Sequence, residues 1–181
     1  MGKCATAKKS KSVLSKLVDA AKSGSLKKVK SILKKNQRVD LNVRNMDSIQ
    51  LLTPLAAAAR SGSLDTVTYL VAQGAEVDGC AADLRPTPLM EAVMSGHEDV
   101  VKFLAGEGAW VNFQEEDGHS CLHYAASRGD LKMVRFLIRN GAKIDELNYQ
   151  GYTPLGMAAC EGKLTVVKSM QKAGANVDAL G

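Results

Sequence analysis

The sequence predicts an all-α protein, a solenoid of about five helix-turn-helix repeats with protruding loops. Three observations predict this fold class. A Thr-Pro-Leu-like motif recurs every 33 or 34 residues, glycines stand at fixed offsets after each motif, and apolar residues lie at helical spacing between them. A period of this length is typical of proteins in which each repeat is one supersecondary unit that buries its apolar face against its neighbours.

The recurring motif predicts the first helix of each repeat. It occurs as Thr53-Pro54-Leu55, Thr87-Pro88-Leu89, Ser120-Cys121-Leu122 and Thr153-Pro154-Leu155. The hydroxyl of Thr or Ser caps a helix, and Pro is tolerated at the first helical position because the N–H that it lacks has no partner within the helix.

Glycines predict where the two helices of each repeat end. One glycine follows the first residue of each motif by nine positions, and another comes twelve positions later. The pairs are Gly62 and Gly74, Gly96 and Gly108, Gly129 and Gly141, and Gly162 and Gly174. Glycine favours the left-handed conformation that ends many helices. After Gly62, the period of a second helix is carried by Leu64, Val67, Leu70 and Val71.

A further column, Val or Ile followed by Asp or Asn, stands fifteen residues after the first glycine and begins the loop. Its members are Val77-Asp78, Val111-Asn112, Ile144-Asp145 and Val177-Asp178. The N-terminal segment fits the same frame if Gly24 is its first glycine, which predicts Val39-Asp40 for this column. Its many lysines suit a terminal repeat, whose outer face needs to be polar because nothing stacks on it.

The domain organisation follows from this frame. We expect a basic, disordered arm over residues 1–12 and one repeat domain over residues 13–181. The expected repeats span residues 13–50, 51–84, 85–117, 118–150 and 151–181.

The pattern resembles the ankyrin repeat, in which a turn, two antiparallel helices and a protruding loop occupy about 33 residues. Residues 117–145 are close to the family consensus throughout, and the match is strong over residues 50–181. The resemblance implies that His123 makes a structural hydrogen bond. It also implies a non-enzymatic adaptor that binds a partner protein with its loop tips and the exposed face of its first helices.

Exposed columns of the repeats supply the expected partner-binding residues, many of them types that are enriched at interface centres. They are Arg85, Met94, Trp110, Phe113, Glu116, His119, Tyr124, Arg128, Leu147, Tyr149, Tyr152 and Met157. The same face is expected to carry Arg60, Glu91 and Glu161. Two alternatives stay open, because Tyr152 stands where an aromatic often packs between loops and Trp110 could cover the neighbouring repeat.

No motif in the sequence predicts catalysis, a cofactor or a metal site. His119 and His123 are four residues apart, but His119 precedes the helix and no further ligands complete a site. Cys121 and Cys160 fall at small or apolar columns, which predicts buried, inert thiols.

The formal charge of +5 is unevenly distributed. Residues 1–35 contain eleven Lys and one acid, a net charge of +10, whereas residues 36–181 carry −5. Such asymmetry indicates an anionic partner for the N-terminal end, either a membrane or a nucleic acid. Nucleic acid is the less favoured of the two, because residues 1–37 contain neither Arg for base contacts nor an aromatic for stacking.

The N-terminal arm fits the pattern for N-myristoylation at Gly2, with Thr6 as its hydroxyl residue and Cys4 available for palmitoylation. One acyl chain anchors a protein only weakly, so a second chain or a basic cluster is needed. The alternative is a solvated basic arm without lipid.

The leading hypothesis is therefore a monomeric, cytoplasmic adaptor held at the inner leaflet of a membrane by its arm. The alternative is the non-catalytic repeat region of a larger enzyme or receptor that has been truncated at Gly181.

Overall fold

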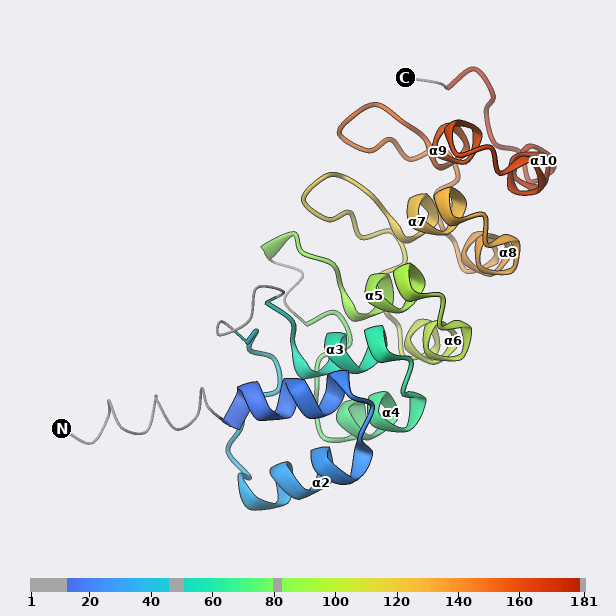
Figure 1. The fold of residues 1–181 in the computed structure, drawn as a ribbon. Helices are drawn as coiled ribbons and strands as arrows, with labels where there is room; N and C mark the ends of the chain where they lie inside the picture. Colours follow the sequence, from blue (N-terminus) through green and yellow to red (C-terminus); the bar gives the residue numbers. More distant parts are fainter. Residues whose placement is uncertain (1–12, 46–50, 80–82, 180–181) are drawn as a thin grey trace.

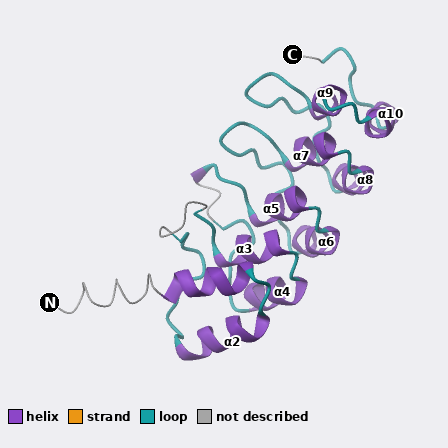
Figure 2. Cartoon of the chain, in the orientation of Figure 1, coloured by secondary structure: helices purple, strands orange, loops and turns teal. Residues whose placement is uncertain are grey.

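The computed structural model describes residues 13–45, 51–79 and 83–179, which form a curved stack of helix pairs (Figure 1). Helices and connecting loops make up these ranges, with no strand among them (Figure 2). The all-α solenoid predicted from the repeats is confirmed.

Each repeat contributes two antiparallel helices. After a helix over residues 13–22, the helices are α2 (Leu26–Lys35), α3 (Pro54–Ser61), α4 (Leu64–Ala72), α5 (Pro88–Ser95), α6 (Glu98–Gly106), α7 (Cys121–Arg128), α8 (Leu131–Arg139), α9 (Pro154–Cys160) and α10 (Leu164–Lys172). The first helices form an inner row and the second helices an outer row (Figure 1). Within the described ranges, each helix is too short or too polar to cross a bilayer.

The first helices begin and end as the sequence predicts. The hydroxyl oxygen of Thr53 accepts a hydrogen bond from the backbone N–H of Ala56 at 3.1 Å, and Thr87 and Thr153 cap their helices in the same way. Gly62 ends α3 with φ at +74°, in the left-handed region that a side chain disfavours.

Alanine lets consecutive first helices approach closely. One column, made up of Ala58, Ala92, Ala125 and Ala158, has no exposed surface in the four repeats from α3 onward. In the outer row, the column of Leu70, Leu104, Leu137 and Met170 is equally buried. The core is therefore one continuous layer that runs through the stack, and each repeat completes the core of its neighbour.

Among the described residues, no further helix pair packs on the far side of α9 and α10. Ala159 is exposed there, although its counterparts Ala59 and Ala126 are fully buried. Cys160 is exposed as well. The prediction of a buried thiol is confirmed for Cys121 and wrong for Cys160, because Cys160 occupies the column of Arg60, Met94 and Ser127, which is only half-buried in the preceding repeats.

Side chains at the start of each loop tie consecutive repeats together. An Asn or Asp oxygen accepts a hydrogen bond from a backbone N–H of the following repeat at 2.8 to 3.0 Å. The pairs are Asn42 with Glu76, Asp78 with Trp110, Asn112 with Lys143, and Asp145 with Asn176. We call this series the loop ladder.

The loop ladder corrects the register of the first repeat. Asn42, and not Asp40, makes the ladder bond to the second repeat, while Asp40 accepts a hydrogen bond from the N–H of Asn42. The prediction of Val39-Asp40 is therefore two residues too early. The first repeat is longer because α2 has ten residues, whereas α4 has nine. In addition, the residue that ends α2, Asn36, has a φ of −139° and does not form a left-handed cap.

His123 connects two repeats at the start of α7. Its Nδ1 accepts a hydrogen bond from the N–H of Ser120 at 3.1 Å, and its Nε2 lies 3.1 Å from the carbonyl oxygen of Tyr152. Because a backbone N–H can only donate, Nδ1 is unprotonated and Nε2–H is the donor to Tyr152. The structural hydrogen bond implied by the family resemblance is confirmed.

The buried imidazole of His123 predicts a dependence of stability on pH. Burial lowers the pKa of His123 below its ordinary value of 6.5, an effect that the bond to Tyr152 opposes. Because the pKa of His123 is lower in the folded state, the unfolded chain binds more protons than the folded one as the pH falls. The stability that depends on neutral His123 is therefore fully present above the unfolded pKa, and it is lost as the pH falls through the folded pKa. The free energy of unfolding, measured by chemical denaturation, should fall between about pH 7 and pH 5.5. It should fall less in the His123→Gln variant than in the unsubstituted protein. Equal losses in the two proteins would contradict the assignment.

Candidate partner-binding surface

Two loops of the same shape project side by side from the inner row of helices (Figure 1). They span residues 113–119, before α7, and residues 146–152, before α9, and are called the paired loops. Each is closed at its tip by a backbone hydrogen bond. The N–H of Glu115 donates to the carbonyl of His119 at 3.2 Å, and the N–H of Asn148 donates to that of Tyr152 at 2.9 Å.

Three hydrogen bonds fix the paired loops against each other. The amide of Gln114 donates to the carbonyl of Leu147 at 2.8 Å, and the N–H of Tyr149 donates to the carbonyl of Asp117 at 3.1 Å. The amide of Asn148 donates to Nε2 of His119 at 3.1 Å. Both loops are thus ordered before any partner arrives.

Gly118 permits this close contact between the loops. Its φ is +79°, and a Cβ built there would lie 2.6 Å from the backbone nitrogen of Tyr149. Any other residue would both strain the turn and separate the loops.

Large side chains on the second of the paired loops are open to solvent. The exposed fractions are 50% for Leu147, 67% for Tyr149 and 39% for Tyr152. Glu116, on the first of the paired loops, is exposed as well. These four residues were predicted from the sequence as partner contacts, and the fold brings them to one surface. The inter-loop bonds that place them there could not be found from the repeat spacing.

Tyr152 also lines a hollow of about 180 Å³ beside α9, together with Met157 and Cys160. Its backbone N–H donates to the side-chain oxygen of Asn148 at 2.8 Å, and its carbonyl accepts from His123. Tyr152 therefore has a backbone that joins repeats and a side chain that is accessible to a partner.

His119 and Tyr124 are more enclosed than the sequence suggested. Nδ1 of His119 lies 3.0 Å from a carboxylate oxygen of Glu115, and its ring is 5.4 Å from that of Tyr124. Burial, followed by the nearby carboxylate of Glu115, raises the pKa of Tyr124 well above its usual range. These two residues support the paired loops from beneath, with only part of each side chain exposed.

Glu115, Asp117 and His119 offer ligand atoms within 4.8 Å of one another. The oxygens of Glu115 accept hydrogen bonds from the backbone N–H groups of Asp117 and His119, each at 3.1 Å. Both ring nitrogens of His119 are in hydrogen bonds too, one with Glu115 and one with Asn148. The cluster therefore closes and supports the loop.

Trp110 and Phe113 extend this region toward α6. Trp110 is 60% exposed, whereas Phe113 is half-buried against the core. Both line a hollow of about 490 Å³ that also includes Gln114, the residue that holds Leu147. Most of the Trp110 side chain is therefore open to solvent and does not cover a neighbouring repeat.

The remaining predicted contacts lie apart from the paired loops. Arg128 is exposed and donates to the carbonyl of Met94 at 2.7 Å, and Met94 and Arg85 are half-buried. Gly2 and Cys4, the predicted acylation sites, lie outside the described residues.

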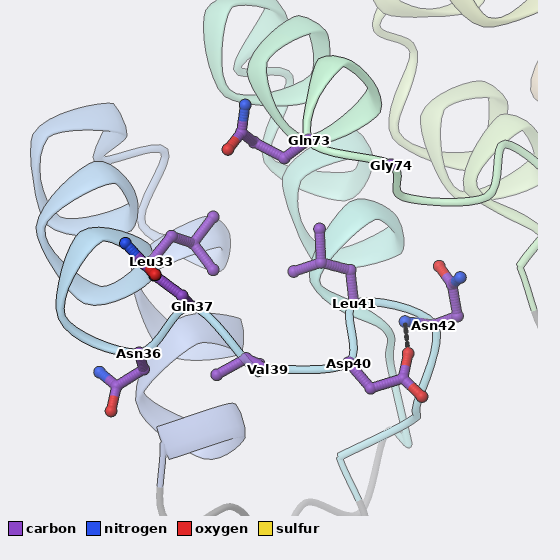
Figure 3. Close-up of a pocket in the computed structure, with 9 residues that line it drawn as sticks. All are labelled: Leu33, Asn36, Gln37, Val39, Asp40, Leu41, Asn42, Gln73 and Gly74. Atoms are coloured by element: carbon purple, nitrogen blue, oxygen red, sulfur yellow. Dashed lines mark hydrogen bonds between the residues drawn. The ribbon is translucent and has the colours of Figure 1, made fainter.

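A hollow that the sequence did not predict lies between the ends of α2 and α4 (Figure 3). It has a volume of about 520 Å³, and its lining includes Leu33, Asn36, Asp40 and Gln73. It lies where the first repeat is longer than the others. The extra residues between Gly24 and Asn42 are the signal that could have indicated it.

Glu91 is a second departure from the sequence-based expectation. It was expected on an exposed face, yet its side chain is 3% exposed and forms an ion pair at 2.8 Å with Arg60, which is 32% exposed. Burial raises the pKa of Glu91, and the charge of Arg60 opposes this effect. The pair joins α3 to α5 and covers the carboxylate.

The Arg60–Glu91 pair predicts a distinctive mutant series. Arg60→Met leaves a buried carboxylate without its nearest cation, and the free energy of unfolding should fall by about 1–3 kcal/mol near neutral pH. Without Arg60 the folded-state pKa of Glu91 rises further, so this loss should grow as the pH increases from about 5 to 7. The double variant Arg60→Met with Glu91→Gln should recover most of the stability in urea titrations. A double variant no more stable than Arg60→Met would refute the prediction.

Comparison with known protein families identifies the repeats. The family model described as ankyrin repeats (3 copies) matches residues 17–115 and 107–180. No curated protein matches the chain closely enough to count as a relative. The family match covers most of the chain and agrees with the helix pairs, the capped first helices and the projecting loops. The chain belongs to the ankyrin-repeat family.

Proposed function

We propose that the protein is a non-enzymatic adaptor that binds a partner protein through the paired loops and the adjoining hollow beside α9. Ankyrin repeats are generally protein–protein interaction modules, which supports a protein as the partner. The repeated columns that build the core leave the loop tips available for recognition.

The observation that carries this proposal is the exposure of Leu147, Tyr149 and Tyr152 on loops that are hydrogen-bonded to each other. A loop that is already ordered loses little conformational entropy when it binds. Tyrosine is enriched among the residues that dominate binding energy, because its ring buries a large area and its hydroxyl can still form a hydrogen bond. Trp110 and Phe113 lie next to this surface and would enlarge it.

Substitutions of Leu147 and Tyr149 test the proposal. Their side chains are exposed, and the bond that Tyr149 makes to Asp117 uses its backbone, so the double variant Leu147→Ala with Tyr149→Ala should fold normally. The partner would be identified by affinity purification and its affinity measured by calorimetry. The variant should bind about 30-fold or more weakly, which corresponds to about 2 kcal/mol.

Leu164→Ala is the matched control. Leu164 is 68% exposed on α10, so the substitution matches the loss of Leu147 at a distance from the paired loops. It should leave the affinity unchanged. An unchanged affinity in the paired-loop variant, or an equal loss in both, would refute this binding surface.

We further propose that Gly2 is myristoylated and Cys4 palmitoylated, which would place the protein at the cytoplasmic face of a membrane. The support is the sequence pattern of the arm, with lysines at positions 3, 8, 9 and 11 beside the two acylation sites.

Acylation predicts a change in mass and in location. In eukaryotic cells, Gly2→Ala should remove the acyl mass and move the protein from the membrane fraction to the supernatant. Cys4→Ser should keep the myristate but weaken membrane retention. An intact protein whose mass shows no acyl group would refute the proposal, whatever its location.

A further inference from the structure

The first repeat carries a concentration of positive charge. Residues 13–35 contain seven Lys and one acid, Asp19. All seven are exposed, and five of them take part in none of the ion pairs or ring contacts found within the described residues. These five are Lys16, Lys27, Lys28, Lys34 and Lys35.

The need for a polar terminal face does not account for this charge. Residues 151–179, at the other end of the described stack, carry three lysines and two acids, a net charge of +1. Residues 13–35 carry a net charge of +6. A mixed surface would keep the first repeat soluble with less internal repulsion.

The positions of two lysines oppose helix stability. Lys27 and Lys28 lie in the first turn of α2, which contains no acid. The N-terminal end of a helix carries a partial positive charge, so cations there are unfavourable. The helices α4 and α6 have Asp65, and Glu98 with Asp99, in the corresponding turn, whereas α8 has Lys132 and no acid there. Lys27 and Lys28 therefore do not stabilise α2 through its dipole.

The geometry gathers the charge on one exposed face. Lys16, on the helix over residues 13–22, and Lys28, on α2, line the same hollow of about 430 Å³, together with the acid Asp19. Lys30 is excluded from this face, because its ammonium lies 5.1 Å from the centre of the ring of Tyr69 in the second repeat. We call the surface of Lys16, Lys27, Lys28, Lys34 and Lys35 the lysine face.

We propose that the lysine face binds the surface of an anionic phospholipid membrane. The inference goes beyond the proposed function, because it concerns a surface other than the paired loops and requires no acyl chain. Lysine is a compact, strongly hydrated charge that suits a diffuse layer of headgroups. The absence of Arg and aromatic residues from residues 13–35 favours a lipid surface over nucleic acid, which is usually recognised with both.

Vesicle binding tests the lysine face directly. The full-length protein, made in bacteria so that it carries no acyl chain, would be sedimented with vesicles of phosphatidylcholine containing about 30% phosphatidylserine, and with vesicles of phosphatidylcholine alone. Binding should require phosphatidylserine and weaken steeply with salt. Each lysine near an anionic surface contributes about a fivefold effect, so Lys16→Gln, Lys27→Gln and Lys28→Gln together should lower the partition coefficient about 100-fold.

The control removes the same charge from the other end of the stack. Lys132, Lys168 and Lys172 are exposed on α8 and α10, and their triple change to Gln should have little effect on vesicle binding. Changing Lys16, Lys27 and Lys28 to Arg should preserve binding, and circular dichroism would check that each variant is folded.

Three results would overturn the proposal. They are the absence of binding to phosphatidylserine vesicles at low salt, equal losses in the two Gln triple variants, and tighter binding to short RNA or DNA than to vesicles at the same salt. The last result would assign the lysine face to nucleic acid. None of these outcomes bears on partner binding by the paired loops, which is measured separately.

Discussion

The structure depends on the burial of each repeat against the next. The alanine column of the first helices and the leucine column of the second are fully buried and run from one repeat to the next, so neighbouring repeats share one core. The loop ladder and the bond from His123 to Tyr152 follow the same direction, from one repeat to the next. The paired loops are an extension of this stacking, since Gln114 and Asp117 of one repeat hold Leu147 and Tyr149 of the next. Recognition and stability therefore use the same inter-repeat contacts.

The sequence predicted those parts of the fold that depend on local chemistry. Thr53 and its counterparts cap helices, and Gly62 and its counterparts end them, because these preferences belong to the residues themselves. Prediction failed where a residue's environment depends on what lies beside it. Cys160 is exposed because its column is only half-buried throughout the stack, and Glu91 is buried where Arg60 of the preceding repeat reaches it. The register of Asn42 was missed because an irregular helix end cannot be located from spacing alone.

The candidate site was predicted in composition but not in organisation. Leu147, Tyr149 and Tyr152 could be selected because they stand on loop tips, outside the columns that build the core, although the column of Tyr152 also allowed an aromatic that packs between loops. The hydrogen bonds that hold the loops together could not be foreseen, because they join backbone groups whose positions depend on the turn at Gly118. His119 and Tyr124 were expected to be open, but they contact each other beneath the loop.

The loop ladder has a consequence for how such a protein can change over evolutionary time. Each of its bonds joins the side chain of one repeat to the backbone of the next, so the acceptor depends on one Asn or Asp and the donor on no particular residue. Trp110, Lys143 and Asn176 differ in every property of their side chains, yet they occupy equivalent positions as donors. A whole repeat could therefore be duplicated, deleted or exchanged, and the loop-ladder bonds to its neighbours would need no compensating substitution in the donor residues. The length of the array can in this way vary independently of the surface that each unit displays.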